Sequence, residues 1–197
     1  MADYELINSV YLGMKKTLTA LFSFLILFLH AQDRYELNSG WRCQQQGKTK
    51  ATGEILSKPG YSLQNWLPAT VPGTVLTSLL NNQMVPDPFY GMNNKTIPDI
   101  GDTGPATYTY WFVKDFDELP IAGKQVWLHF RGINYAADFY LNGKKLNSTT
   151  HKGMFLRKEF LITDLLAKNG KNRLAVIVYP PDQPGKANGG QGGDGTI

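Results

Sequence analysis

Short stretches of alternating apolar and polar residues constrain the fold of this chain more than any other feature. The clearest one, residues 136–141, leads directly into Asn142-Gly143 and returns through residues 144–146. Asn-Gly between two such stretches is the strongest local signal for a β-hairpin, because both turn residues need positive φ. Further strands are expected at 108–113, 125–130, 155–162 and 173–179. Short strands separated by Gly, Asn and Pro turns predict an all-β sandwich of two sheets.

Two short helical insertions and one long loop interrupt these strands. Residues 75–80 are expected to be helical with Thr74 as the N-cap, and residues 163–166 form a single turn. Residues 85–106 hold four prolines and three glycines without periodicity. A loop of this length inside a compact domain is usually functional or disordered, so it is the first place to look for a site.

The beginning of the chain matches an export signal. Lys15 and Lys16 precede a twelve-residue apolar core at 18–29. A bilayer span needs about 20 residues, so the pattern predicts a secretory signal peptide cut after Ala31, with residues 1–13 as an upstream extension. An N-terminal membrane anchor is the alternative.

The mature chain predicted in this way, residues 32–197, is long enough for one domain of ordinary size. Its net charge stays at +4 and its lysines are scattered, which argues against a nucleic-acid partner. Its single cysteine, Cys43, can form no internal disulfide, so the domain must fold on its hydrophobic core alone. We therefore expect a secreted or periplasmic domain with no stable membrane anchor.

Combinations of residues typical of catalysis are sparse. Beyond the signal only His129 and His151 remain, and His129 is expected to face outward from its strand. No His or Cys spacing fits a metal site, so neither a metal nor a cofactor is expected. The run 190–195 matches a dinucleotide-binding pattern, but it lacks the preceding strand and the following helix that pyrophosphate binding requires. The Gly-rich run 189–195 instead predicts that this chain is the front of a larger protein.

The long loop carries polar and aromatic side chains whose role the residues alone leave open. Its carboxylates are Asp87, Asp99 and Asp102. Asp is well suited to capping turns, and no spacing selects a pair that would flank a glycosidic bond. Ligand contact and packing are both compatible with Phe89 and Tyr90, whereas Trp111 lies in a strand and is expected in the core. Asn94 and Asn147 each begin an N-glycosylation acceptor sequence.

Several motifs resemble those of glycoside hydrolase family 2. Residues 66–75 resemble its W-x-P-A-x-V-P-G-T-V motif, and residues 86–93 resemble the proline-rich PDPFYG-type loop of its mannosidase and exo-glucosaminidase branch. Residues 130–143 resemble its F-x-G-I-x-Y hairpin. Each motif is short, but they occur in the family's order between about Trp41 and Ile197.

The resemblance implies a galactose-binding-like jelly roll that forms the non-catalytic, sugar-binding N-terminal domain of an exported, retaining exo-β-glycosidase. In the family, an immunoglobulin-like domain and a (β/α)8 barrel follow, and the barrel carries both catalytic glutamates. No catalytic residue is therefore expected in this chain. The expected partners are a β-linked oligosaccharide or glycoconjugate substrate and the remaining domains of the same protein.

The resemblance also implies which residues contact the substrate. The family's first domain sends loops to the rim of the active site, which selects Asp87, Tyr90 and Asn93 on the long loop and Asp194 near a second loop. Asp and Asn side chains bind vicinal hydroxyls, and an aromatic ring covers the apolar face of a sugar. Because a fold does not fix a function, a free-standing carbohydrate-binding module and the structural remnant of a frameshifted gene stay open as alternatives.

Overall fold

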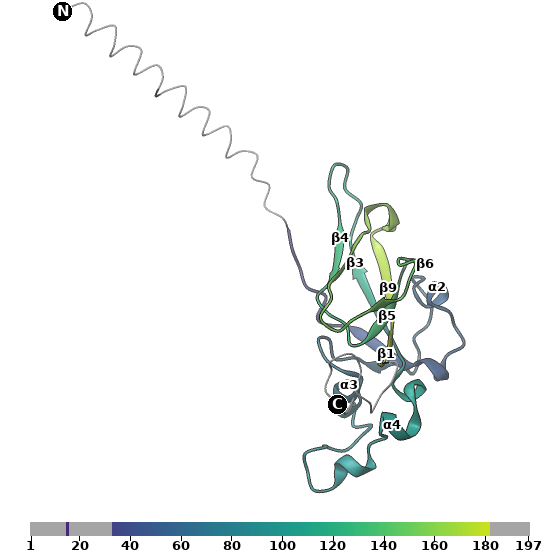
Figure 1. Ribbon diagram of the computed structural model, residues 1–197. Helices are drawn as coiled ribbons and strands as arrows, with labels where there is room; N and C mark the ends of the chain where they lie inside the picture. The colour runs from purple at the N-terminus through teal and green to yellow at the C-terminus, as the bar shows by residue number, and fades with distance from the viewer. Residues whose placement is uncertain (1–14, 16–32, 182–197) are drawn as a thin grey trace, which may run out of the picture. The chain divides into compact units, whose positions relative to one another are not determined.

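The computed structural model describes Lys15 and residues 33–181 (Figure 1). The chain divides between Glu36 and Leu37 into two compact units, and the second unit is the domain discussed below. Apart from Lys15, the predicted signal peptide lies outside the described residues, as do the Gly-rich run and Asp194. Within those residues, no helix has the length and apolar character needed to cross a lipid bilayer.

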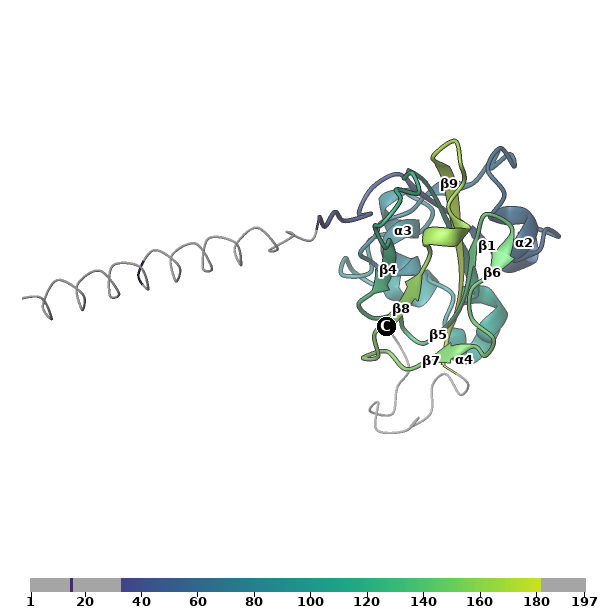
Figure 2. The same ribbon diagram turned by 90° about the horizontal axis from the view of Figure 1, so that it is seen from above.

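The domain is built from antiparallel strands in two sheets (Figure 2). In chain order, the strands of the described residues are β1 (Trp41–Gln45), β2 (Leu67–Pro68), β3 (Tyr110–Asp117), β4 (Trp127–Phe130), β5 (Ala136–Leu141), β6 (Lys144–Lys145), β7 (His151–Lys152), β8 (Lys158–Leu161) and β9 (Lys171–Tyr179). The larger sheet has the order β2-β1-β3-β9-β5-β6, and β7 also pairs with β5. The smaller sheet is the pair β4-β8. This architecture confirms the predicted all-β sandwich.

The register of the three central strands separates two sets of core residues. Val176 of β9 pairs with Phe112 of β3 on one side and with Phe139 of β5 on the other. These three side chains share one face of the sheet because neighbours in a strand alternate between faces. The adjacent residues of these strands point to the opposite face, where Ala175 of β9 pairs with Tyr140 of β5.

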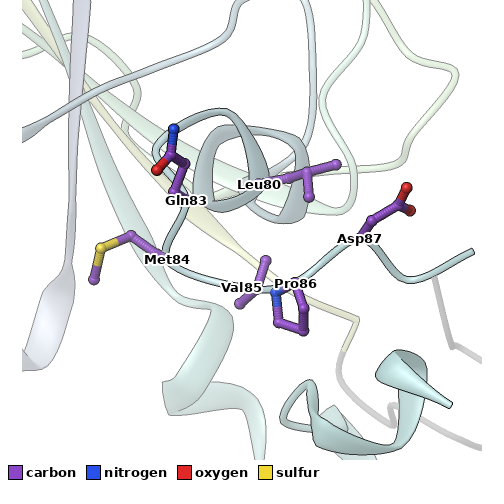
Figure 3. A pocket seen from close by; sticks show the side chains of 6 residues that line it. All are labelled: Leu80, Gln83, Met84, Val85, Pro86 and Asp87. Carbon is purple, nitrogen blue, oxygen red and sulfur yellow. The ribbon is translucent and has the colours of Figure 1, made fainter. Parts of the chain in front are cut away.

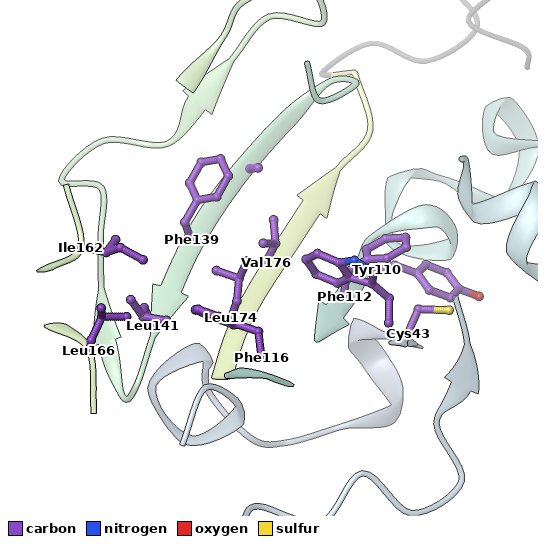
Figure 4. Close-up of a cluster of buried hydrophobic side chains, with 12 residues drawn as sticks. Cys43, Tyr110, Phe112, Phe116, Phe139, Leu141, Ile162, Leu166, Leu174 and Val176 are labelled. Atoms are coloured by element: carbon purple, nitrogen blue, oxygen red, sulfur yellow. The ribbon is translucent and has the colours of Figure 1, made fainter. Parts of the chain in front are cut away.

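The first face packs against the smaller sheet. The Phe139 ring lies 4.4 Å from that of Phe130 and 5.0 Å from that of Phe160, measured between centroids. Figure 4 shows Phe139 within this cluster, with Leu141 and Ile162 nearby. Aromatic contacts of this kind add to the free energy gained from burial.

The second face is covered by a segment without strands, which the sequence patterns did not predict. Leu56 and Trp66 from this segment are buried against Trp111. The segment includes the short helix α2 (Gly53–Leu56), and a Cβ on Gly53 would lie 2.4 Å from the Tyr140 ring. Glycine is therefore required where α2 crosses the sheet, and the central strands are buried on both faces.

The local predictions hold, with shifted boundaries. Asn142 and Gly143 have φ values of 50° and 86°, as the predicted hairpin requires. The Thr74 side chain accepts a hydrogen bond from Thr77 N and caps α3 (Val75–Asn81). Strand β8 begins three residues later than expected because residues 153–156 form a turn at Gly153, where φ is 127°.

The long loop contains short helical turns rather than irregular backbone alone. These are η2 (Asn93–Thr96), α4 (Ile100–Thr103) and η3 (Pro105–Tyr108). Two further 3-10 turns, η1 (Gln46–Lys48) and η4 (Thr163–Leu165), lie outside the loop. The turn η4 confirms the single turn expected at 163–166. Since only Thr109 separates η3 from β3, the loop ends at the end of the larger sheet where β3 begins.

Candidate functional site

A shallow pocket opens where α3 ends and the long loop begins (Figure 3). Its volume is about 490 Å³. Its lining consists of apolar side chains with one amide and one carboxylate: Leu80, Gln83, Met84, Val85, Pro86 and Asp87. The pocket is open to solvent and presents polar and apolar surface side by side.

The end of α3 places these residues through a specific cap. Met84 N donates to Leu79 O and Gln83 N donates to Leu80 O, both at 2.9 Å. This is the Schellman pattern, in which the residue after the C-cap takes the left-handed conformation and is usually Gly. Gln83 occupies that position with φ of 57°. A non-glycine residue here costs free energy, so the strained backbone lies directly at the pocket.

The loop holds Asp87, Tyr90 and Asn93 together through its own hydrogen bonds. Asp87 Oδ1 accepts from the backbone N–H of Phe89 at 2.9 Å. Asp87 O accepts from Asn93 Nδ2 at 3.0 Å and from Tyr90 N at 3.2 Å. The three residues predicted as substrate contacts therefore form one compact turn. Whether they contact a sugar stays a prediction.

Two aromatic rings project from this turn into solvent. The exposed fraction is 96% for Phe89 and 76% for Tyr90. Rings held this far from the core are available to stack on a flat apolar surface such as the face of a sugar. These exposed fractions exclude packing of the two rings against other described residues.

The turn-capping interpretation also holds for Asp99. Its Oδ1 accepts from Gly101 N at 2.6 Å, at the start of α4. The Tyr108 hydroxyl donates to Pro98 O, and desolvation with the nearby Asp99 charge raises the pKa of Tyr108. Asp87 caps a turn in the same way, yet only through Oδ1 among the described contacts. Asp99 likewise caps its turn through Oδ1 among the described hydrogen bonds, so the two carboxylates have the same local role.

Asp87 is the single carboxylate that lines the pocket within the described residues, while retaining hydrolysis needs two carboxyl groups about 5 Å apart. His129 is exposed as predicted, with Nδ1 at 3.0 Å from Glu159 Oε1 on the outer face of the smaller sheet. Sequence reasoning missed Gln83, because nothing in its local sequence marks a left-handed residue.

Comparison with known proteins decides the family. The family described as "Glycosyl hydrolase 2 galactose-binding domain-like" matches residues 41–193. This chain belongs to glycoside hydrolase family 2. Because the match begins at the first strand and runs past the last, it covers the whole described sandwich and confirms the resemblance noted in the motifs.

Relatives in the family are named as glycosidases. A mannosylglycoprotein endo-β-mannosidase of Lilium longiflorum is 48% identical and covers 82% of this family 2 chain. An exo-β-D-glucosaminidase of Streptomyces avermitilis is 31% identical over 72% of the chain. The chain spans only 17% and 15% of the length of these two relatives. It therefore corresponds to one domain of much longer proteins.

Solved structures of family 2 enzymes share the fold. An exo-chitosanase of Amycolatopsis orientalis matches with a TM-score of 0.63 at 28% identity, over 73% of this chain and 16% of that protein. A β-D-mannosidase of Dictyoglomus thermophilum matches with a TM-score of 0.57 at 25% identity, over 81% of this chain and 18% of that protein. These matches support the galactose-binding-like sandwich.

Proposed function

We propose that this chain is the non-catalytic, sugar-binding N-terminal domain of an exported, retaining β-glycosidase of the mannosidase or glucosaminidase type. The family match and the small share of each relative support a domain of a longer hydrolase. The single carboxylate at the pocket supports a binding role, with both catalytic carboxyl groups supplied by the remaining chain.

One observation carries the choice of substrate. The relative with 48% identity is named as an endo-β-mannosidase acting on mannosylglycoproteins, which favours a β-mannoside in a glycoconjugate. Other relatives are named as exo-β-D-glucosaminidases, so β-glucosaminides are the second substrate class to assay. The relatives include both endo-acting and exo-acting enzymes. The exo action that the motifs imply is therefore also tested, with nitrophenyl β-mannoside and nitrophenyl β-glucosaminide.

In this proposal the turn at residues 87–93 borders the substrate. Asp87 accepts hydrogen bonds from sugar hydroxyls through the oxygen that does not cap the turn. Tyr90 covers a ring face, and Asn93 holds the turn in shape through its bond to Asp87 O. Asp194 is retained as a proposed contact from a second loop.

The test begins with the coding sequence that follows codon 197. An open frame encoding a barrel with two glutamates is the expected result, and the encoded protein should cleave nitrophenyl β-mannoside or β-glucosaminide. The 197-residue chain alone should cleave neither substrate. A stop codon at that point, or hydrolysis by the isolated chain, would refute the proposal.

The substrate contact is tested in that longer enzyme. Asp87→Ala should raise KM or lower kcat, because a sugar hydroxyl loses its acceptor, while the melting temperature stays unchanged. Asp164→Ala is the matched control, since Asp164 is also an exposed carboxylate but lies on η4. Wild-type kinetics for Asp87→Ala would remove this residue from the pocket.

A free-standing carbohydrate-binding module is the second candidate. It is favoured by the exposed rings and the pocket, which this domain forms without any other chain. Calorimetry of the 197-residue chain with β-mannobiose distinguishes the two. A dissociation constant of about 1 mM or tighter, near −4 kcal/mol, supports a module, whereas no detectable heat supports a partial pocket completed by further domains.

Export is tested separately. Expression with the native N-terminus should yield a secreted or periplasmic protein whose first residue is Gln32, because cleavage is proposed after Ala31. A protein that is found in the membrane fraction and still contains residues 18–29 would instead favour an N-terminal membrane anchor.

A further inference from the structure

We propose that the end of the sandwich formed by residues 131–135 and 153–157, here called the basic end, docks onto an acidic surface of the remaining chain of the same protein. This rests on the proposed function, in which this domain is one part of a longer glycosidase. The docking face adds to that function by naming the surface through which the domain joins the rest of the enzyme.

Two large apolar side chains are exposed at the basic end. The exposed fraction is 88% for Phe155 and 57% for Leu156. They are adjacent in sequence and lie in a turn. In a strand, packing against a neighbouring strand or sheet would have covered them. Contiguous exposed apolar surface that is rimmed by polar groups marks interaction sites, whereas single exposed apolar side chains do not.

Backbone hydrogen bonds tie this turn to the sheet. Gly153 N donates to Tyr135 O at 2.9 Å, and Leu156 N donates to Gly153 O at 3.2 Å. A Cβ on Gly132 would lie 2.9 Å from Met154 O, so the two loops are packed backbone against backbone. Because the turn is already shaped, docking costs little ordering entropy.

The chain leaves the sheet at the same place. Tyr135 N donates to Tyr179 O at 3.1 Å, and Tyr179 is the last residue of β9. The polypeptide that follows β9 therefore starts one hydrogen bond away from the loop 131–135. In the proposed longer protein, whose relatives are several times the length of this chain, the polypeptide continues from this end of the sandwich.

The charge around the exposed ring defines the partner. Arg131, Lys152 and Arg157 are exposed at the basic end, and Lys158 lies 5.3 Å from the Phe160 ring centroid. The pairing of Phe130 with Lys158 directs Arg131 and Arg157 to neighbouring positions just past the strand ends. A basic rim around an apolar centre fits a partner with acidic side chains around an apolar depression.

Docking here also places the partner at the end of the larger sheet where the long loop enters β3. The long loop enters β3 at Tyr110, and Tyr110 pairs with Val178 next to the end of β9. The C-terminal end of the long loop and the basic end therefore lie at the same end of the larger sheet.

Hydroxyl-radical footprinting tests the proposal on two proteins, the 197-residue chain and the longer protein encoded by the same reading frame. The oxidation rate of Phe155 should fall about tenfold in the longer protein, as expected for a ring at the desolvated centre of an interface. Leu119 is the internal control because it is 52% exposed beyond the opposite end of β3, and its rate should not change.

Charge reversal provides the second readout. Arg157→Glu in the longer protein should uncouple the melting of this domain from that of the remainder and lower kcat/KM, with the largest loss at low salt. Lys168→Glu is the matched control, since Lys168 is exposed beside η4 at the opposite end. The isolated chain carrying Arg157→Glu should keep its melting temperature, because the wild-type side chain makes no described ion pair.

The outcomes are separable. Equal oxidation of Phe155 in both proteins, with an active longer enzyme, would overturn the docking and leave the proposed function intact. Protection of Phe155 already in a dimer of the 197-residue chain, seen by sedimentation, would assign the face to a second copy and overturn the proposal. Absence of any longer encoded protein would remove the proposed function and this docking together.

Discussion

The central strands and the long loop use the same residue types for opposite purposes. Phe139 on β5 is completely buried, while Phe89 on the loop is 96% exposed. Asn147 is buried with its amide fully engaged, while Asn93 is partly exposed and ties one turn of the loop. The comparison shows that the sheet obtains its shape from burial, whereas the loop obtains its shape from local hydrogen bonds. This leaves the side chains of the loop available for a ligand.

The largest effect is expected for a matched pair of phenylalanines. Phe139→Ala should lower the free energy of unfolding by about 3–5 kcal/mol, because it leaves a cavity between two other aromatic rings. Phe89→Ala should change it by less than about 0.5 kcal/mol. Urea denaturation of both variants measures the difference, and similar losses would abolish the distinction between the two regions.

The next effect concerns a matched pair of asparagines. Asn147 Oδ1 accepts from Phe139 N at 3.0 Å, and its Nδ2 donates to Asp138 Oδ1 at 2.8 Å and to Thr149 O at 2.9 Å. Asn147→Ala should cost about 2–3 kcal/mol, because it leaves buried groups without partners. Asn93→Ala should cost less than about 1 kcal/mol. An equal cost, measured by the same denaturation, would show that the loop is as strongly built as the sheet.

A smaller effect is expected at alkaline pH, where the buried region contains a thiol. Burial raises the pKa of Cys43 from 9.0 to about 11. The folded state thus favours the protonated thiol, so its contribution to stability is complete below about pH 9 and is lost as pH rises towards 11. Cys43→Ala should flatten the fall in unfolding free energy over this window. A slope identical to that of the wild type would contradict the assignment.

The smallest effect is expected at the start of the loop, with opposite signs at adjacent residues. Gln83→Gly should stabilise the domain by about 0.5–1 kcal/mol, because glycine adopts the left-handed conformation without strain. Met84→Gly should destabilise it by about 0.5–1 kcal/mol through the added entropy of the unfolded chain. Thermal unfolding of both variants checks the signs. Loss of sugar binding in stable Gln83→Gly would identify the strained side chain as part of the pocket.

Local chemistry made much of the sandwich predictable. The hairpin at Asn142-Gly143 and the cap at Thr74 depend on neighbours in sequence, and both are present as expected. The outward direction of His129 followed from alternation along a strand, and the burial of Trp111 followed from its being an aromatic residue in a strand; both are observed. The alternation of apolar and polar residues did not predict that β5 is buried on both faces, because an alternating pattern assumes that one face of the strand is exposed to water.

The candidate site was predictable only in part. Asp87, Tyr90 and Asn93 came from a motif, and the structure brings them into one turn, while their contact with a sugar stays a prediction. Gln83 was not predictable, since its left-handed backbone follows from how α3 ends against the pocket. Likewise, the acceptor sequence at Asn147 gives no sign that folding buries this amide.

By itself, then, the sequence determined the strand pattern, the turn types and the family, because each depends on a few adjacent residues. The tertiary structure alone decided which segment covers the second face of the sheet and which asparagine lies in the interior. It also decided that the loops at 131–135 and 153–157 meet beside the end of β9. These features depend on pairing between residues far apart in the chain, where burial and hydrogen bonding of the whole domain select one arrangement among many that are locally acceptable.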